Sequence, residues 1–300
     1  MGVVYRARAL EHGNREEALK AVSMKKGASD EVVQRFKREI MTASLVEHEN
    51  VCAVFDAGEA EGIAFMSMEL VEGEELRDVI TREAPIDPER ALGYIEQIVR
   101  GLDACHEAHV IHRDLKPENV RVTKKDGREV CKIVDFGIAR LVSNDPAVTE
   151  NVFVTMKGKL SGTPAYVAPE LVMEPELVDA RADLYAVGII LYELLTGKLP
   201  YNAKTIRELL SDSVGSRPIP LEDAIPGKVV PQPYQRVLFK LLEKDQLVRY
   251  QSAKATLEAI AEARTAAAPK KKGSRRSGTA AALGAKPEGT GCLGFLFKKK

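Results

Sequence analysis

The hydrophobic pattern of the chain changes near residue 75, and this change restricts the fold more than any other feature. Before it, short runs of aliphatic and aromatic residues are bounded by Gly, Asn or acidic turns, which is typical of strands. After it, apolar residues recur at three- and four-residue spacing, which predicts helices. An α+β fold is therefore expected, with strands at Val3–Ala9, Ala18–Ser23, Val51–Ala57 and Ile63–Leu70.

Two of the predicted helices have clear end signals. Asp87-Pro88 supplies an N-cap followed by proline at the first helical position. Asp183–Thr196 is nearly apolar all round, and Gly197 is placed to end it. Between these two helices, residues 109–170 lack a helical pattern, and a long irregular segment inside a compact domain is usually functional. Further helices are expected from near Ser29, and at Thr205–Ser213, Tyr234–Glu243 and Ser252–Arg264.

Charge is distributed unevenly along the 300 residues, although the formal net charge is zero. Residues 265–300 hold nine basic residues and one acidic residue, so this tail carries +8 and the rest of the chain −8. An acidic body with a basic tail does not fit a nucleic-acid-binding domain, which would have a basic face on its folded part. We expect the tail to be disordered, because its composition offers too little apolar surface to offset the entropy of ordering it.

The four cysteines, Cys52, Cys105, Cys131 and Cys292, are far apart and show no metal-ligand spacing. Three of them lie in strongly apolar contexts, which predicts reduced, buried thiols. No run approaches the ~20 apolar residues that span a bilayer. Met1 is followed directly by a strand-like run, so no signal peptide is expected either. These features predict a cytoplasmic protein.

Three motifs carry the strongest chemical signal. They are His112–Asn119 (H-R-D-L-K-P-E-N), Asp135-Phe136-Gly137 and Ala168-Pro169-Glu170. In this order and spacing they resemble the catalytic loop, the metal-binding loop and the A-P-E motif of bacterial-type serine/threonine protein kinases. The resemblance covers residues 1 to about 262, all of the chain but its tail.

The resemblance implies a two-lobed protein kinase fold within residues 1–264. A small β-rich lobe with one main helix would occupy about residues 1–70, and a larger, mostly helical lobe about residues 74–264. ATP would bind in the cleft between the lobes. The basic tail, 265–300, lies outside the resemblance.

The resemblance also implies a role for each polar residue of the motifs. Asp114 would accept the proton of the substrate hydroxyl and orient it, and Lys116 would contact the γ-phosphate of ATP. Asn119 and Asp135 would bind Mg²⁺, which takes oxygen ligands. Asp114 lies five residues before Asn119, and Asp135 sixteen residues after it, which makes the pattern specific.

Two residues indicate the class of substrate. Lys116, two residues after the presumed catalytic Asp, is similar to the lysine of serine/threonine kinases. Thr163, in Gly162–Tyr166, lies where the family's Thr bonds to the catalytic Asp and Lys. Tyrosine kinases differ at both positions. The resemblance therefore implies transfer of the ATP γ-phosphoryl group to Ser or Thr hydroxyls of protein substrates.

The first third of the chain would supply the rest of the ATP site. Ala18-Leu19-Lys20 resembles the strand of the nucleotide-positioning lysine, and Lys20 would hold the α- and β-phosphates and pair with Glu39. A lone lysine at a strand end is usually solvated surface, so this assignment depends on the other motifs. Met68 would be the gatekeeper, and the backbone of Glu69 and Val71 would bond the adenine edge.

Other matched positions are structural or regulatory. Asp183 resembles the buried aspartate that ties the catalytic loop to the large helix, and Arg249 the arginine that pairs with Glu170. A charge in an apolar setting requires such a partner. Arg113, before the catalytic Asp, is typical of kinases whose activation loop is ordered by phosphorylation. By position, the candidates for autophosphorylation are Thr149 and Thr155.

Two departures from the family pattern concern ATP binding. The chain begins Met1-Gly2-Val3-Val4-Tyr5, which matches only the last glycine of the glycine-rich loop and the strand after it. Gly2 and Val4 are therefore the ATP-binding candidates here, and we hypothesise that the true start lies upstream. Arg121 falls where the family usually has an apolar residue under adenine. Its aliphatic stem could pack there while the guanidinium reaches water.

Two alternatives to an active protein kinase remain open. A pseudokinase, which binds or scaffolds without useful turnover, is favoured by the incomplete glycine-rich loop and by Arg121. A small-molecule phosphotransferase of kinase-like fold is disfavoured by Lys116, Thr163 and Ala168-Pro169-Glu170, which serve peptide substrates.

The end of the tail bears on membrane contact. Gly291–Lys300 places a short apolar cluster beside three lysines and could touch an anionic membrane. We favour a solvated end, because so short a segment anchors poorly.

Overall fold

The computed structural model of the chain describes residues 3–10, 13–23, 40–60, 62–135 and 164–268. All of these residues belong to one unit, Met1–Ala268. Several predicted positions lie outside the described residues, namely Gly2, Glu39, Thr149, Thr155, Thr163 and the basic tail.

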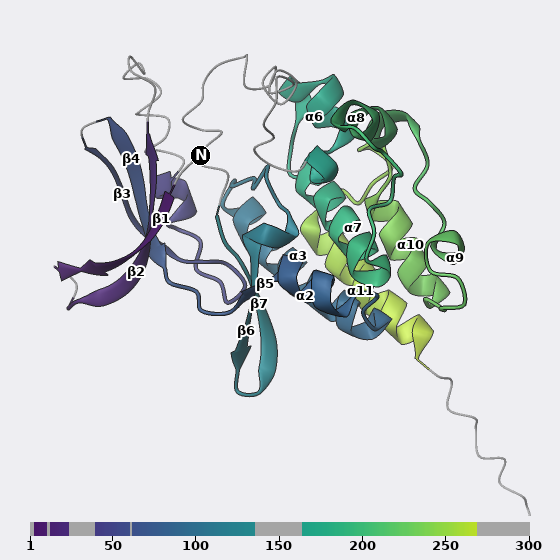
Figure 1. Cartoon of the computed structure of the whole chain (residues 1–300), viewed down its shortest axis with the longest axis horizontal. Coiled ribbons are helices and arrows are strands. Elements are labelled where there is room, and N and C mark those ends of the chain that lie inside the picture. The colour runs from purple at the N-terminus through teal and green to yellow at the C-terminus, as the bar shows by residue number, and fades with distance from the viewer. Residues whose placement is uncertain (1–2, 11–12, 24–39, 61, 136–163, 269–300) are drawn as a thin grey trace, which may run out of the picture. The chain divides into compact units, whose positions relative to one another are not determined.

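A four-stranded antiparallel sheet comes first in the chain. Its strands lie in the order β1 (Val3–Ala9), β2 (Arg15–Ser23), β4 (Ile63–Glu69) and β3 (Val54–Ala60) (Figure 1). The register places Ala18 opposite Met68, and Lys20 between Val4 and Met66. Alternate residues of a strand face opposite sides of a sheet, so all five of these residues share one face. Four of the positions predicted to line the ATP site are thus brought together: Val4, Ala18, Lys20 and Met68.

The strand predicted at Val51–Ala57 begins later, at Val54. Val51 instead forms an isolated parallel bridge with Ile133. The amide of Cys52 donates to the carbonyl of Ile133 at 2.8 Å, and the amide of Ile133 donates to the carbonyl of Asn50 at 2.8 Å. The apolar run was therefore predicted correctly as extended chain, but its first residues pair with a strand that is distant in sequence.

A second sheet contains β5 (Glu74–Glu75), β6 (Val120–Lys125) and β7 (Arg128–Ile133). Strands β6 and β7 form a hairpin whose turn residues, Asp126 and Gly127, have φ values of 50° and 75°. Two consecutive positive φ angles are what a tight two-residue hairpin requires. The hairpin lies within residues 109–170, which were predicted only to be non-helical, so its strands are regular structure that the sequence pattern did not reveal.

Helix α7 (Arg181–Thr196) lies at the centre of the helical part and is buried along nearly its whole length (Figure 1). It packs against α3 (Pro88–Glu107) and α10 (Gln232–Leu241), and α11 (Ala253–Ala267) packs against both of those helices. The remaining helical elements are α2 (Leu76–Glu83), η2 (Pro117–Asn119), η3 (Pro164–Tyr166), α6 (Pro169–Met173), η4 (Pro175–Leu177), α8 (Ile206–Gly215) and α9 (Leu221–Ala224).

The predicted end signals of the two large helices are present. The Asp87 carboxylate accepts from the amides of Glu89 and Arg90 at 3.0 and 3.2 Å. Gly197 has a φ of 72°, and its amide donates to the carbonyl of Glu193 at 2.8 Å. At the other end of the domain, α11 runs to Ala267, three residues beyond the predicted boundary at residue 264.

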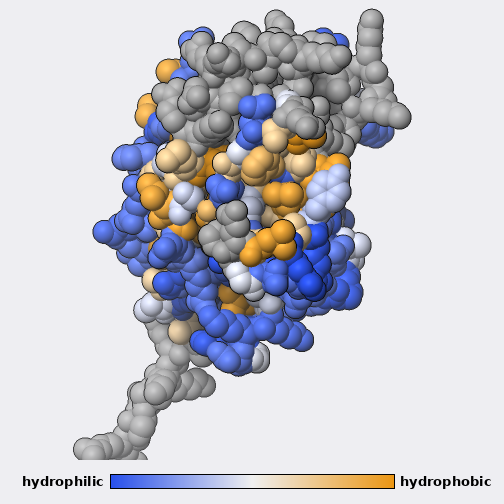
Figure 2. All heavy atoms as spheres, turned by 90° about the vertical axis from the view of Figure 1, so that its left-hand side faces the viewer, coloured by the Kyte–Doolittle hydropathy of each residue, from blue (hydrophilic) through white to orange (hydrophobic). Residues whose placement is uncertain are grey.

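Some apolar side chains remain on the surface. Figure 2 shows hydrophobic residues gathered among hydrophilic ones on one face of the molecule. On β1, which is an edge strand among those described, Val3, Val4 and Tyr5 are each more than half exposed. Among the described residues, none of the helices is both long enough and apolar enough to cross a membrane.

Candidate active site

The predicted catalytic residues form a connected group. Lys116 Nζ donates to Asp114 Oδ2 at 2.9 Å. Asn119 Nδ2 donates to the carbonyl oxygen of Asp114 at 2.7 Å and lies 3.3 Å from its Oδ2. The side chain of Asp114 is one-third exposed, so its carboxylate is held by two neighbours and still accessible to solvent. Such a group can accept a proton from a ligand.

The orientation of Asn119 fits a metal-binding role. Its amide nitrogen faces Asp114, so its carbonyl oxygen lies on the other side of the amide group. A carbonyl oxygen is a suitable ligand for Mg²⁺, which usually takes one or two protein ligands and completes its shell with water and phosphate oxygens. Among the residues that the structure describes, three or more His, Cys, Asp or Glu side chains nowhere gather as a metal site. The Asn119 carbonyl oxygen would thus fit a Mg²⁺ ion that takes most of its other ligands from water and phosphate oxygens.

Lys20 and Asp135 are brought together although 115 residues separate them. Lys20 Nζ forms an ion pair with Asp135 Oδ1, and the lysine side chain is 10% exposed. Burying an ammonium group is costly unless a carboxylate pairs with it. The predicted partner of Lys20, Glu39, lies outside the described residues. Asp135 also has a φ of 66°, a conformation that non-glycine residues rarely adopt and that is concentrated at functional sites.

The predicted gatekeeper and hinge begin in the last residues of β4. Met68 is buried, and the amide of Glu69 donates to the carbonyl of Ala53 at 2.8 Å. The Glu69 carboxylate pairs with Lys132 at 2.7 Å and accepts from the Ala53 amide at 3.3 Å, so it is directed toward these groups. The Glu69 amide is thus occupied, and the Glu69 carbonyl accepts from the Cys52 thiol, whose sulfur lies 3.4 Å away. A carbonyl oxygen has two lone pairs, so it can still receive a donor from a base. These contacts do not involve Val71, so its predicted role in bonding the adenine edge stays a prediction.

Arg121 extends from β6 toward the chain that follows the hinge. Its Nη1 donates to the carbonyl of Gly73 at 3.1 Å, and its Nη2 lies 3.6 Å from Glu75 Oε1. Position 73 favours glycine, because its φ is 139° and an added Cβ would lie 2.4 Å from the carbonyl oxygen of Val122. The arginine at the predicted adenine floor therefore has polar partners of its own at the edge of the site.

Asp183 of α7 holds the backbone of the catalytic loop. Its carboxylate accepts from the amides of His112 and Arg113, each at 2.9 Å, and lies 2.9 Å from His106 Nε2. Burial raises the pKa of this carboxyl, but the hydrogen bond and charge of His106, together with His112, outweigh it and hold the pKa below its usual value. Arg113 has a φ of 60°, so this contact also supports an unfavourable backbone conformation.

A second buried charge has the partner predicted for it. Arg249 donates to both oxygens of Glu170, at 2.6 and 3.0 Å, and its side chain is fully buried. Its remaining donors reach the carbonyls of Arg181 and Glu243. A bidentate pair with all its hydrogen bonds satisfied is the arrangement in which a buried ion pair is tolerated.

Sequence reasoning missed three contributors to the site. His106 lies at the end of the α3 stripe, and Lys132 faces Glu69 from β7. Arg77 of α2 contacts the catalytic loop through Glu118. A polar residue on an otherwise apolar helix face was the available signal for His106. Lys132 and Arg77 had none, because their partners are set by the packing of distant segments.

The sheet with its buried lysine, the catalytic loop on a helical support and the buried ion pair define a two-lobed protein kinase fold. The chain belongs to the family described as "Protein kinase domain", whose family model matches residues 1–259. Both the family and the fold expected from the motifs are therefore confirmed.

Individual relatives agree with this assignment. The chain is 40% identical over 266 residues to serine/threonine-protein kinase pkn2 of Myxococcus xanthus, covering 89% of this chain and 31% of that protein. It is 35% identical to pkn3 of the same organism, covering 87% of this chain and 48% of that protein. The crystal structure of the PknI kinase domain double mutant of Mycobacterium tuberculosis matches with a TM-score of 0.66 and 26% identity, covering 88% of this chain and 90% of that one. The chain thus spans less than half the length of these two curated relatives.

Proposed function

We propose that this chain is a serine/threonine protein kinase domain that transfers the γ-phosphoryl group of ATP to Ser or Thr hydroxyls of proteins. The observation that carries the proposal is the connected group formed by Asp114, Lys116 and Asn119, on a loop anchored by Asp183. The names of the relatives, all serine/threonine-protein kinases, support the choice of Ser and Thr as acceptors.

The proposed reaction uses these residues in defined roles. The hydroxyl oxygen of the acceptor attacks the γ-phosphorus, the bond from that phosphorus to the oxygen bridging it to the β-phosphate breaks, and ADP leaves with that oxygen. Asp114 takes the hydroxyl proton, and Lys116, 2.9 Å from Asp114, neutralises charge on the transferred group. Mg²⁺ would be held by Asn119 and Asp135 and would supply neutralisation of the phosphate oxygens.

The small sheet would bind the nucleotide. Lys20 is already desolvated and directed at Asp135, so it is poised to share the α- and β-phosphates with a metal at that carboxylate. Val4, Ala18 and Met68 share its face and would cover the base. The Glu69 carbonyl and the Val71 amide would bond the base edge. Gly2 and Glu39, outside the described residues, keep their predicted roles as hypotheses.

Thr149 and Thr155 remain our candidates for autophosphorylation, with Arg113 as the group that would bind the phosphate. We place the activity in the cytoplasm, because Cys52, Cys105 and Cys131 are buried free thiols, which reducing compartments preserve.

The test is phosphoryl transfer by the purified chain. The protein is incubated with Mg²⁺ and labelled ATP, with and without a mixed Ser/Thr peptide library, and labelled residues are mapped by mass spectrometry. The matched variant is Asp114→Asn, which keeps the volume and the hydrogen bonds but cannot accept a proton at neutral pH. Loss of the base typically costs about 10²–10⁴-fold in rate.

Label on Ser or Thr that is lost in Asp114→Asn would support the proposal. Label only on Tyr, or equal label in both proteins, would contradict it. Absence of label in a folded wild-type protein that still binds ATP would favour a pseudokinase. The same chain extended upstream by a glycine-rich segment then distinguishes an incomplete enzyme from an inactive one.

A further inference from the structure

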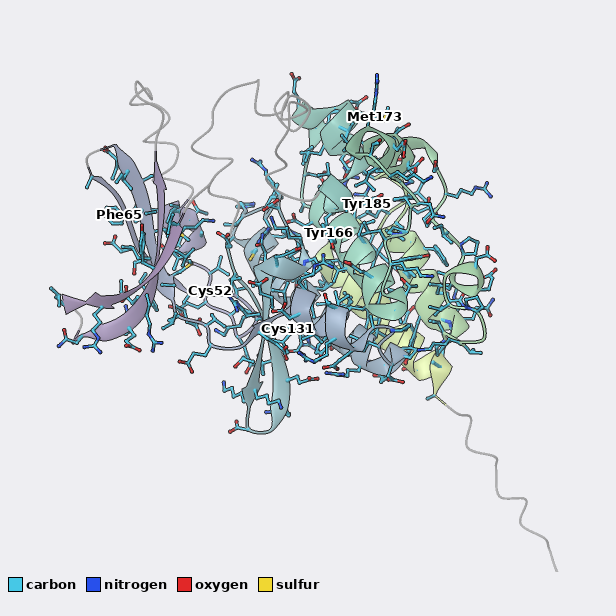
Figure 3. The ribbon with its side chains drawn as sticks, in the orientation of Figure 1. Cys52, Phe65, Cys131, Tyr166, Met173 and Tyr185 are labelled. Carbon is cyan, nitrogen blue, oxygen red and sulfur yellow. The ribbon has the colours of Figure 1, made fainter. Side chains whose placement is uncertain are left out.

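Lys244 lies between segments that are distant in the chain. Its Nζ donates to the hydroxyl of Tyr185 at 3.4 Å and to the hydroxyl of Tyr201. It also donates to the backbone carbonyl of Asp212 at 3.3 Å. Tyr185 belongs to α7 (Figure 3), Tyr201 follows that helix, and Asp212 belongs to α8. All three of these acceptors are neutral oxygens.

The lack of a carboxylate partner sets Lys244 apart from other buried lysines. The side chains of Lys20, Lys116 and Lys132 are 10%, 19% and 18% exposed, and each ammonium group pairs with an aspartate or a glutamate. In the part of the chain that the structure describes, Lys244 forms hydrogen bonds to neutral groups but no ion pair with a carboxylate. An ammonium group that is removed from water without such a partner tends to lose its proton.

The charges around Lys244 do not compensate for its burial. Burial lowers its pKa, and the carboxylates of Asp212 and Glu243 raise it only in part. The guanidinium of Arg249, which lies 5.1 Å from the centre of the Tyr185 ring, lowers the pKa further. The result is a pKa of about 8. At pH 7 roughly one Lys244 in ten is then a neutral amine, against fewer than about one in a thousand for a solvated lysine.

The Lys244 amine is therefore a nucleophile outside the proposed phosphoryl-transfer site, where it has no role. Its side chain is only partly buried, so it keeps contact with solvent. The ammonium group lies 4.1 Å from the centre of the Tyr201 ring and 5.7 Å from that of the Tyr185 ring. A reagent that reaches the nitrogen beside these rings has to be small and has to carry its own leaving group.

We propose that Lys244 is a site of N-acylation by small acyl phosphates. The neutral amine nitrogen attacks the acyl carbon, the bond from that carbon to the phosphate oxygen breaks, and inorganic phosphate leaves with the electron pair. The amine proton passes to water. The product is a neutral amide with one N–H donor in place of the three donors of the ammonium group. This inference does not depend on the proposed kinase function.

The experiment compares the acetylation rates of two lysines in the folded wild-type chain. The protein is incubated with acetyl phosphate at pH 7.5, without ATP or Mg²⁺, and acetylation at each lysine is measured by mass spectrometry at low conversion. The reference is Lys240, an exposed lysine four residues earlier that also lies near a tyrosine ring, that of Tyr250 at 4.7 Å. We expect Lys244 to react about tenfold faster, because its larger fraction of neutral amine outweighs the lower nucleophilicity that accompanies a lower pKa.

The pH dependence separates this explanation from a difference in exposure. The ratio of the Lys244 rate to the Lys240 rate cancels hydrolysis of the reagent. This ratio should fall by up to about tenfold per unit between pH 8 and 10, because Lys244 is already neutral while a solvated lysine still gains neutral amine. The tyrosines remain protonated in this range, since burial raises the pKa of Tyr201 to about 12 and that of Tyr185 well above its usual value.

Unfolding the chain provides the control, because it needs no variant. In urea sufficient to unfold the protein, both lysines are solvated and the ratio at pH 7.5 should be about one. Three results would each overturn the proposal: a ratio of one or less in the folded protein at pH 7.5, a ratio that does not change between pH 8 and 10, or a high ratio that persists in urea.

Discussion

Individual charged residues in this domain contribute to stability according to their burial. Arg249 and Glu170 form a fully hydrogen-bonded pair whose side chains are 0% and 6% exposed. Lys125 and Glu49 form a pair at 3.3 Å with side chains 64% and 58% exposed. The two pairs have similar chemistry, so they allow the effect of burial to be measured within one molecule.

Removing one partner of the buried pair should destabilise the domain strongly. Arg249→Met leaves the Glu170 carboxylate without its guanidinium, and we expect the free energy of unfolding to fall by about 3–5 kcal/mol. Lys125→Met, the exposed counterpart, should change it by less than about 1 kcal/mol. Urea unfolding followed by circular dichroism checks both values. Similar losses in the two variants would contradict the burial argument.

Lys244 is expected to make stability depend on pH in the alkaline range. Burial beside Tyr185 and Tyr201 lowers its pKa from 10.5 to about 8. Between these pH values the unfolded chain binds more protons than the folded one, so the free energy of unfolding should rise with pH. Above pH 10, Tyr201, whose pKa burial raises to about 12, acts in the opposite direction. The rise is thus confined to about pH 8–10.

The measurement is urea unfolding at several pH values from 7 to 10 for wild type and Lys244→Met. The free energy of unfolding of wild type should rise relative to that of the variant by at most about 1.4 kcal/mol per pH unit. The rise should be smaller than this limit because the lysine is partly exposed. If the free energies of unfolding of the two proteins change in parallel with pH, the folded protein does not destabilise the Lys244 ammonium group.

At the residue scale, the motifs predicted which residues have a role at the site. They predicted less well which residues contact each other. The pairing of Glu170 with Arg249 and the bonds of Asp183 to the catalytic loop were expected from position, and both are present. The contacts of Lys20 with Asp135 and of Arg77 with Glu193 were not expected. Such contacts depend on how distant elements pack, which no local pattern in the sequence encodes.

Among the elements, two glycines within helices have opposite surroundings. A Cβ at Gly188 of α7 would lie 2.9 Å from Leu241 Cβ and 3.2 Å from the Leu241 backbone. A Cβ at Gly93 of α3 would meet only Arg264 Nη2, at 3.7 Å. Gly188 therefore allows α7 and α10 to approach closely, whereas no such contact requires glycine at position 93.

Alanine substitutions at these two glycines should change stability in opposite directions. Gly188→Ala forces α10 away from α7 and should destabilise by about 1–3 kcal/mol. Gly93→Ala reduces the entropy of the unfolded chain and should stabilise by about 0.5–1 kcal/mol. Chemical unfolding of both variants at one pH checks the signs. Stabilisation by Gly188→Ala would mean that the two helices adjust at no cost.

At the element scale, strongly periodic segments were predicted well and short polar ones were not. The N-cap at Asp87 and the helix end at Gly197 have local causes, so the sequence revealed both. Helix α2 and the β6–β7 hairpin were missed, because half of their residues are charged and each element is too short to give a distinct periodic signal. The strand start at Val54 was misplaced because the preceding residues pair with β7.

At the scale of the whole domain, two hydrophobic clusters form the interior. One contains the small sheet together with Cys105 of α3, and the other contains the helices with the β6–β7 hairpin. Contacts that connect the regions include the Cys52 amide to Ile133, the Ile133 amide to Asn50, and the Lys132–Glu69 ion pair. Cys105 belongs to the first cluster but lies on α3, whose other buried residues belong to the second cluster. Helix α3 therefore contributes side chains to both clusters.

Each hydrophobic cluster contains at least one cysteine, so thiol labelling can measure whether the two clusters unfold together. Cys52 and Cys105 lie in the first cluster and Cys131 in the second. Burial raises the pKa of Cys52 and of Cys105 to about 12 and raises that of Cys131 further. The thiolate is the reactive form, so all three should resist iodoacetamide in the native protein at pH 8 and react once exposed.

Pulsed labelling across a urea series, with mass spectrometry of the three peptides, tests whether the clusters unfold together. Because α3 packs into the first cluster and the Asn50–Cys52 segment is bonded to β7, we expect one labelling midpoint for Cys52, Cys105 and Cys131. Labelling of Cys52 and Cys105 at lower urea than Cys131 would instead show the first cluster opening as a separate unit. Val54→Ala, which removes apolar volume from the first cluster, should shift all three midpoints equally if unfolding is cooperative, and only the first two if it is not.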